Sequence, residues 1–248
     1  SFELGRLRED LEGDGWTVVR EDVSRTATPT SVRSVIRTRY NEDPANTSHV
    51  FLLGHVPVPY SGFAAYDGHY DHTGAWPADA FYGDIDGVWT DVATSNNSNL
   101  ICVVESSCLT ISNRIANFYG DGKFDQSTIP SKVELAVGRV DFVDMPAFLP
   151  KSEKDLLRQY LNKDHLFRVG GINARGDKGM TFDQFPFRHE QDTWKDFVTF
   201  FGQNGFASDG NIFTSPTSNP YLWLRVAGGG YPNGIYSGPS TSNLANNG

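Results

Sequence analysis

The sequence predicts an α/β fold, in which a mostly parallel β-sheet carries helices on both faces and is interrupted by a long loop-rich insertion. Two observations support this prediction. The first fifty residues alternate between helical and strand-like patterns with short connections, which is typical of a parallel sheet covered on both faces. A second apolar strand pattern returns at residues 133–140, after a stretch dominated by Gly, Pro, Asp, Asn and aromatic residues.

Leucines recur at helical spacing close to the N-terminus, at Leu4, Leu7 and Leu11, and they predict a first helix. The turn formed by residues 13–15 (GDG) ends this helix. Residues 16–19 (WTVV) then read as a short strand, because they combine β-branched residues with an aromatic one.

A second helix is expected to begin at Thr30 or Ser31, either of which can act as its N-cap. Its apolar face consists of Val32, Val35, Ile36 and Tyr40. Residues 49–53 (HVFLL) form a continuous apolar strand that Gly54 ends. Helix, strand, helix and strand thus follow one another in the first part of the chain.

Residues 54–131 are expected to form long loops with at most short strands, and a stretch of this length inside a compact domain is usually functional. After the strand at 133–140, Ser152 caps a helix with Leu156, Leu157, Tyr160 and Leu161 on one face. Aromatic residues predict a further helix over 194–201, and residues 221–226 (YLWLRV) form the last strand. We expect residues 1–248 to be a single domain, a fragment of a longer exported protein.

The composition excludes several classes of protein. The chain has 248 residues and a formal net charge of −9, and its isoelectric point is about 5.1. Nucleic-acid binding needs a concentrated basic surface, which this sequence lacks. No apolar run approaches the roughly 20 residues of a membrane span. Acidic loops rich in Asn, Ser, Thr and Gly favour an extracellular or cell-surface protein.

Cys102 and Cys108 are the two cysteines of the chain. Their spacing does not match the CxxC pairs of zinc sites or redox motifs. Two unpaired thiols and a local disulfide that closes a loop both fit the sequence.

Ligands of open α/β sheets bind beyond the carboxyl ends of the strands. Three segments are expected there: the loop after residue 53, the loop after residue 140 and the glycine run after residue 226. The first contains His55, which we regard as a binding candidate. The third contains Gly228, Gly229 and Gly230, whose backbone N–H groups could form an anion-binding nest or an ordinary glycine-rich turn.

His69, Asp71 and His72 lie within four residues of one another, and Asp79 follows in the same loop. Imidazole and carboxylate groups together suit a divalent metal such as zinc, iron or manganese. The alternative is that these side chains are solvated or hydrogen-bonded to turn backbones, as is common for Asp in loops.

Carboxylates alternate along two further segments, at Asp84 and Asp86 and at Asp121 and Asp125. This alternation is typical of calcium-binding loops, in which every second residue supplies an oxygen. Neither segment matches the twelve-residue loop of an EF-hand, and each fits an Asx-turn equally well.

Three stretches, in order, resemble the gingipain-type cysteine peptidases: residues 51–57 (FLLGHVP), 78–87 (ADAFYGDIDG) and 133–140 (VELAVGRV). The chain also resembles a subgroup of large exported bacterial proteins, through residues 67–69, 74–79 and 120–130. The resemblance covers most of residues 1–230 and implies a caspase-like fold.

In that family, activity requires a His in a G-H-G turn and a Cys at the end of the following strand. The corresponding turn here is residues 227–230, in which Gly229 stands at the His position. The strand that would present the Cys is expected beyond Gly248, and Cys102 and Cys108 map onto neither position. The resemblance therefore implies the fold more directly than the activity.

Three functions follow as hypotheses. The first is a peptidase-related exported domain that is non-catalytic and acts as an interaction or structural module for a protein or extracellular polymer, with calcium holding its loops. The second is an active gingipain-type cysteine peptidase whose nucleophile lies downstream. The third is a metal-dependent hydrolase that uses His55, His69, Asp71, His72 and Asp79, with the metal activating a water molecule.

Overall fold

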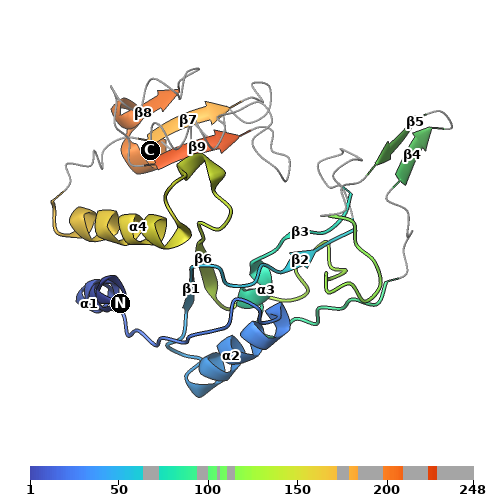
Figure 1. Ribbon diagram of the computed structural model, residues 1–248, viewed down its shortest axis with the longest axis horizontal. Coiled ribbons are helices and arrows are strands. Elements are labelled where there is room, and N and C mark those ends of the chain that lie inside the picture. The colour runs from blue at the N-terminus through green and yellow to red at the C-terminus, as the bar shows by residue number, and fades with distance from the viewer. Residues whose placement is uncertain are drawn as a thin grey trace. The chain divides into compact units, whose positions relative to one another are not determined.

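A computed structural model describes residues 1–63, 73–93, 100–104, 107–110, 115–171, 179–183, 198–208 and 223–227. Residue contacts divide the chain into two compact units. One is Val19–Val143, and the other combines Ser1–Val18 with Asp144–Gly248. Figure 1 labels the elements of both units, which are described one at a time below.

Helix α2 (Pro29–Glu42) is the main helix of the Val19–Val143 unit. Its N-cap is Thr28, whose side chain accepts a hydrogen bond from the backbone N–H of Ser31 at 3.2 Å. Pro29 fits the first turn because its missing N–H would have no partner there. The predicted helix is confirmed, but the predicted cap was wrong, because the helix begins before Thr30.

Strand β1 (His49–Leu53) pairs in parallel with β6 (Ala136–Val140), with His49 opposite Ala136 and Leu53 opposite Val140. The pairing continues beyond the strands, where the N–H of Gly54 donates to the carbonyl of Val140 at 2.8 Å. The structure therefore confirms a mixed α/β fold with parallel pairing. In this unit the described parallel sheet has two strands, and β6 begins three residues later than the sequence pattern indicated.

The strand predicted at residues 16–19 was wrong: no part of this described segment is in a strand. Trp16 and Val19 are 46% and 66% exposed. A short β-favouring pattern needs a neighbouring strand to pair with, and a four-residue segment carries no information about such a partner.

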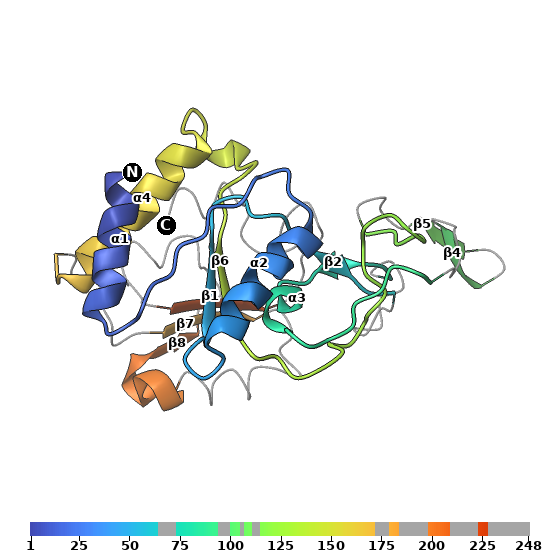
Figure 2. The same ribbon diagram turned by 90° about the horizontal axis from the view of Figure 1, so that it is seen from below.

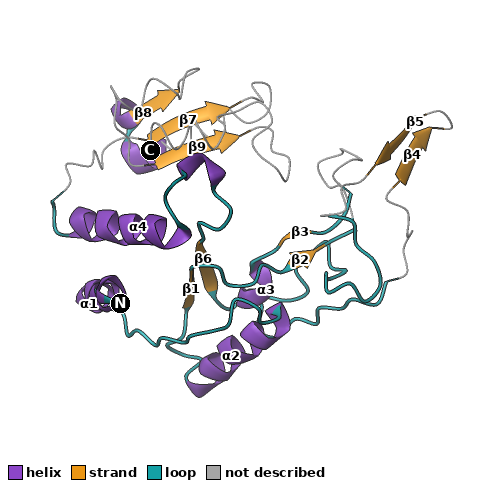
Figure 3. Cartoon of the chain, in the orientation of Figure 1, coloured by secondary structure: helices purple, strands orange, loops and turns teal. Residues whose placement is uncertain are grey.

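In the described residues between β1 and β6, the loops are interrupted by short elements alone (Figure 3), as the composition indicated. They are β2 (Tyr60–Ser61), β3 (Trp76–Pro77), α3 (Ala80–Gly83), β4 (Leu100–Val104) and β5 (Ser107–Thr110). The pairs β2–β3 and β4–β5 are antiparallel. In the β4–β5 register the backbone of Cys102 lies opposite that of Cys108, while the local disulfide itself stays a prediction.

The core of this unit is aromatic and is drawn from α2, β1, α3 and the loops. Its buried members are Val32, Leu52, Val56, Phe81, Tyr82 and Phe124. The rings of Phe81 and Phe124 are stacked with centroids 4.4 Å apart, and Trp89 meets Phe81 edge-on at 5.4 Å. The loop-rich segment therefore supplies much of the core rather than lying outside it.

The second unit contains α1 (Phe2–Gly13), the 3₁₀ turns η2 (Pro146–Phe148) and η3 (Gln203–Gly205), and α4 (Glu153–Arg168). Helices α1 and α4 lie side by side (Figure 2). Ser152 caps α4 as predicted, in a reciprocal capping box with Asp155. None of the described helices is long and apolar enough to cross a membrane.

A parallel sheet of three strands belongs to the same unit. Strand β7 (Gly179–Asp183) lies between β8 (Phe206–Ser208) and β9 (Trp223–Ala227). The last strand was predicted, although it begins and ends slightly later than expected, whereas β7 and β8 were not. Of the helix predicted over 194–201, residues 198–201 are helical as predicted, and residues 194–197 lie outside the described residues.

Candidate functional site

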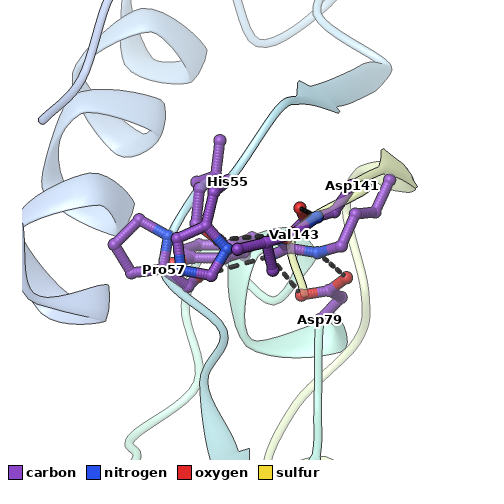
Figure 4. Close-up of polar contacts among 8 residues, drawn as sticks. His55, Pro57, Asp79, Asp141 and Val143 are labelled. Atoms are coloured by element: carbon purple, nitrogen blue, oxygen red, sulfur yellow. Dashed lines mark hydrogen bonds and ion pairs between the residues drawn. The ribbon is translucent and has the colours of Figure 1, made fainter. Parts of the chain in front are cut away.

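The loops that follow β1 and β6 meet at one edge of the parallel pair, because the carboxyl ends of parallel strands lie on the same side. His55 lies two residues beyond β1, and Asp141 directly follows β6. The Nδ1 atom of His55 is 2.9 Å from Oδ2 of Asp141 (Figure 4). We call His55, Asp79, Arg139 and Asp141 the β1–β6 edge.

Asp141 fixes the orientation and tautomer of the His55 imidazole. The carboxylate accepts, so Nδ1 of His55 carries the proton, and Oδ1 of Asp141 accepts from the N–H of Val143 at 2.9 Å. The side chain of Asp141 is 12% exposed and that of His55 is 29% exposed. In this tautomer Nε2 is a hydrogen-bond acceptor and a potential base on a partly exposed ring.

Arg139 joins three segments of the unit. Its Nε and Nη2 atoms donate to the two carboxylate oxygens of Asp79 at 2.7 and 2.8 Å, in a bidentate pair (Figure 4). Nη1 donates to the carbonyl of Val56 at 2.5 Å, and Nη2 also donates to that of Pro57 at 3.3 Å. Burial lowers the pKa of Arg139, but hydrogen bonding to Asp79 and its charge outweigh burial, so the pKa lies above its ordinary value.

Tyr82 supports the same loop from the core. Its hydroxyl donates to the carbonyl of Pro57 at 2.6 Å, and the side chain is fully buried. Burial raises the pKa of the phenol well above its ordinary value, so Tyr82 acts as a neutral donor at physiological pH. Together, Tyr82 and Arg139 hold the backbone on which His55 is mounted.

The sequence identified His55 as a binding candidate and Asp79 as a metal-ligand candidate, but it did not identify Asp141, Arg139 or Tyr82. The sequence did contain one signal for Arg139 and Asp141, which is their position along the chain. Arg139 and Asp141 lie at the end of a predicted strand, in the segment where ligands of α/β sheets bind. The structure brings Asp79 to this edge through its pairing with Arg139, which occupies both of its oxygens.

Asp84, a calcium candidate, is fully buried in a hydrogen-bond network. Its carboxylate accepts from the N–H of Gly87 at 2.8 Å, from the indole N–H of Trp89 at 2.9 Å and from the hydroxyl of Ser131. The hydrogen bond from the N–H of Gly87 to the Asp84 side chain is the kind found in an Asx-turn, which was the alternative to calcium binding at this segment. Asp86 lies exposed beside it, and calcium at this segment stays a prediction.

Arg33 of α2 fills the space behind this turn, where it donates to the carbonyls of Asp84 and Gly87 at 3.1 and 2.9 Å. Only 8% of Arg33 is exposed, and burial lowers the pKa of its guanidinium. Its guanidinium also lies 4.8 Å from the centroid of the Phe81 ring. The only indication of this role in the sequence is an arginine next to the apolar face of a predicted helix.

The other calcium candidates, Asp121 and Asp125, lie on one described loop. Asp121 accepts from the N–H of Lys123 at 2.9 Å and from that of Phe118 at 3.2 Å, which forms a local turn. Asp125 accepts through Oδ2 from the hydroxyl of Thr90 at 2.8 Å and from two backbone N–H groups. The two carboxylates therefore serve different parts of the loop.

The remaining candidates lie outside the described residues: His69, Asp71, His72, Gly228, Gly229 and Gly230. In the part of the chain that the structure describes, no three His, Cys, Asp or Glu side chains are grouped so that they could hold a metal ion. The His-Asp-His metal site and the glycine nest stay predictions.

Comparisons with known proteins returned no match. No protein-family model matches the chain, and neither a curated protein nor a solved structure is significantly similar to it. The functional argument therefore depends on the residues of this chain and on the geometry of the β1–β6 edge.

Proposed function

We propose that the chain is a peptidase-related, caspase-like domain of an exported protein, and that it acts as a non-catalytic binding module outside the cell or at its surface. The partner is a protein or an extracellular polymer. The observation that carries the binding function is the β1–β6 edge, where a partly exposed imidazole is mounted on a backbone held by Arg139 and Tyr82.

The arrangement of the resembling stretches supports the family relationship. Residues 51–57 form most of β1 and the loop after it, residues 78–87 contain α3, and residues 133–140 contain β6. All three belong to the Val19–Val143 unit. Residues 51–57 contribute Leu52 and Val56 to its core cluster, residues 78–87 contribute Phe81 and Tyr82, and Val137 of residues 133–140 packs against it. These segments, which are distant in sequence, therefore lie together in one unit, and this supports the proposed relationship.

A preorganised edge favours binding because little conformational freedom is lost when a ligand arrives. Arg139 and Asp79 neutralise each other within the edge, and the carboxylate of Asp141 is 12% exposed against 29% for the side chain of His55, so a ligand meets mainly the imidazole. The Nε2 atom of His55 suits a ligand that donates a hydrogen bond, such as a peptide N–H or a sugar hydroxyl.

Binding can be tested with arrays of short peptides and of bacterial polysaccharides, probed with the labelled protein. We expect bound spots whose intensity falls at least about tenfold in His55→Ala, as when a hydrogen bond to a ligand is lost. His49→Ala is the matched control, since His49 is exposed and lies at the opposite end of β1. Equal binding by wild type and His55→Ala would exclude the β1–β6 edge as the ligand site.

An active hydrolase is the second candidate, and the His55–Asp141 pair favours it. A carboxylate on Nδ1 and an accessible Nε2 are the parts of a general base, which typically contributes about 10²- to 10⁴-fold to rate. Cleavage of labelled casein by the wild type, abolished in His55→Ala, would establish this activity and overturn the non-catalytic proposal.

The inhibition pattern then separates the two hydrolase mechanisms. A gingipain-type cysteine peptidase loses its activity on alkylation with iodoacetamide, because the thiolate is the nucleophile. A metal-dependent hydrolase built on His69, Asp71 and His72 keeps its activity after alkylation and loses it with a chelator. The absence of casein cleavage under all these conditions is the result that we expect.

A further inference from the structure

The hairpin formed by β4 and β5 (Figure 1) contains both cysteines of the chain. Three consecutive residues of β4, from Leu100 to Cys102, lie opposite three consecutive residues of β5, from Thr110 back to Cys108. The two cysteines are therefore direct cross-strand neighbours in the backbone. Their spacing along the sequence is compatible with other registers as well, so this placement comes from the structure.

Direct opposition meets the distance that a disulfide requires. Residues that face each other across an antiparallel pair have Cα atoms about 4.5–5.5 Å apart and lie on the same face of the sheet. A disulfide joins residues whose Cα atoms are about 4.4–6.8 Å apart. The backbone positions of Cys102 and Cys108 therefore allow a bond between them without a change of register.

The register of this hairpin changes immediately beyond the cysteines. Cys102 pairs with Cys108, but the next pair is Val104 with Ser107, so β4 has one residue more than β5 between these two pairs. An extra residue of this kind is a β-bulge, which interrupts the ladder of hydrogen bonds. The cysteine pair is thus the last regular pair before the ladder becomes irregular, and a covalent link there would prevent the strands from slipping.

The small size of this sheet also favours a covalent link. Among the described strands, β4 and β5 pair with each other alone. An isolated two-stranded hairpin is at best marginally stable in water. A disulfide between its strands would stabilise it by restricting the unfolded chain.

We infer that Cys102 and Cys108 form an intramolecular disulfide that locks the register of the β4–β5 hairpin. In the oxidation, the thiolate of one cysteine attacks a disulfide oxidant such as glutathione disulfide, forms a mixed disulfide with it and releases one thiol. The thiolate of the other cysteine then displaces the second thiol. The two cysteines together lose two protons and two electrons, which convert the oxidant into two thiols.

This disulfide is separate from the β1–β6 edge, and its existence does not depend on what binds there. It agrees with the extracellular location that we propose, because disulfides form and persist mainly in oxidising compartments. Its role is to hold the hairpin in the loop-rich segment of the Val19–Val143 unit. Reduction should therefore loosen β4 and β5 and leave the pairing of β1 with β6 intact.

Counting thiols on the full chain tests the bond. The protein is folded in the presence of glutathione disulfide, denatured, and treated with a maleimide reagent before and after reduction. We expect no reactive thiol before reduction and two afterwards, and an unreduced monomer that is lighter than the reduced one by two hydrogen atoms. Two reactive thiols in the unreduced protein, or a disulfide that joins two copies of the chain on a non-reducing gel, would overturn the inference.

A cysteine moved by one position is the matched control for the register. The double substitution Cys108→Ser with Leu109→Cys keeps two cysteines but places the second opposite Ile101, on the other face of the hairpin from Cys102. Circular dichroism before oxidation shows whether the variant is folded. We expect it to form an intramolecular disulfide at least about tenfold more slowly than the wild type, and equal rates would contradict the register argument.

Hydrogen–deuterium exchange tests the role of the bond. Reduction should raise the exchange rates of the β4 and β5 amides by about tenfold or more, while the amides of β1 and β6 keep their rates. The double substitution Cys102→Ser with Cys108→Ser should exchange like the reduced wild type whether or not reductant is present. Exchange of β4 and β5 that does not respond to reduction of the wild type would show that the bond does not lock the hairpin.

Discussion

Position 87 requires glycine because the carboxylate of Asp84 leaves no room for a side chain there. A Cβ atom at this position would lie 1.9 Å from Oδ2 of Asp84, which is closer than any real contact. We expect Gly87→Ala to displace the buried Asp84 carboxylate from the indole of Trp89 and from the backbone N–H of residue 87. The loss of these hydrogen bonds should lower the free energy of unfolding by about 1–3 kcal/mol. Urea denaturation followed by tryptophan fluorescence measures this change.

Gly138→Ala is the control for that variant, because the nearest atom to its added Cβ is Cδ2 of Phe51 at 3.9 Å, an ordinary contact. Its expected effect is within about 0.5 kcal/mol. Equal destabilisation by the two substitutions would show that the clash with Asp84 is not the cause.

The β1–β6 edge marks the limit of sequence reasoning at the residue scale. His55 was identified as a binding candidate because it follows a predicted strand, and ligands of open α/β sheets bind beyond the carboxyl ends of strands. Its partner Asp141 is 86 positions away, and no spacing in the sequence indicates such a contact. Asp84 is a second example. Calcium loops and Asx-turns share one pattern of alternating carboxylates, so the sequence could not distinguish them. The hydrogen bonds from Trp89 and Ser131 to Asp84 became visible only in the structure.

At the scale of elements, the N-terminus of α4 depends on one carboxylate. Asp155 accepts hydrogen bonds from the hydroxyl and the backbone N–H of Ser152, and these bonds hold its pKa below the ordinary value. A carboxyl group with a lowered pKa stabilises the fold above its unfolded pKa, and this stabilisation is lost as pH falls through the folded value. We therefore expect part of the acid destabilisation of the protein, below about pH 4, to arise at this cap.

Asp155→Asn should remove that part of the pH dependence. Thermal unfolding midpoints measured between about pH 7 and about pH 2 should fall less steeply in the variant than in the wild type, with a lower midpoint at neutral pH. Glu9→Gln, which removes an exposed carboxyl from α1, is expected to keep the wild-type profile. Identical profiles for wild type and Asp155→Asn would contradict the role of the cap.

Helix α1 is attached to α4 by a series of polar contacts, while none of its own residues is buried. Successive turns pair Glu3 with Arg158 at 3.3 Å, Arg6 with Asn162 at 2.5 Å, Asp10 with His165 at 2.9 Å and Asp14 with Arg168. The side chains of the ion pairs among them are between 13% and 49% exposed, and ion pairs in contact with water contribute little individually and are screened by salt. The attachment of α1 should therefore be weak and sensitive to ionic strength.

Hydrogen–deuterium exchange can measure this sensitivity. Raising sodium chloride from about 0.05 M to about 1 M shortens the screening length to roughly 3 Å, so the amides of α1 should exchange faster. Amides of α2, which buries Val32 and Arg33, are the internal reference and should change little. Exchange of α1 that does not respond to salt would mean that its leucines, rather than its charges, hold it.

The elements that the sequence identified correctly are those with local signals. Helices α1, α2 and α4 have apolar spacing or caps that can be read within about a dozen residues, and β1 is a continuous apolar run. Strand β2 has two residues and exists through its pairing with β3, so its signal is not local. The strand predicted at 16–19 was wrong for the same reason, because a local pattern does not supply a neighbouring strand, and no described strand pairs with this segment.

At the scale of the whole molecule, the sequence predicted the α/β class, while the division into two units came from the contacts. The parallel pairing of β1 with β6 joins segments separated by a loop-rich stretch that the sequence described mainly by its composition. That stretch supplies Phe81, Tyr82 and Phe124 to the core. No hydrophobic periodicity in the sequence predicted that these three residues would be buried. The aromatic content of the stretch was the available signal.

The Val19–Val143 unit should fold on its own. Every buried member of its core cluster lies between residues 19 and 143, as do Arg33, Asp84 and the whole β1–β6 edge. A fragment of this length is within the size range of independently folding domains. We expect residues 19–143 to unfold in one cooperative transition, and to show the near-ultraviolet circular dichroism of packed aromatic rings.

Phe81→Ala is the reference for that experiment. It removes the ring that stacks on Phe124 and meets Trp89, and it should cost about 3–5 kcal/mol, enough to abolish the transition in a fragment of marginal stability. A fragment 19–143 that gives the same non-cooperative curve as its Phe81→Ala variant would show that the unit requires the rest of the chain. A cooperative transition in the fragment alone would instead show that the β1–β6 edge belongs to an autonomous domain.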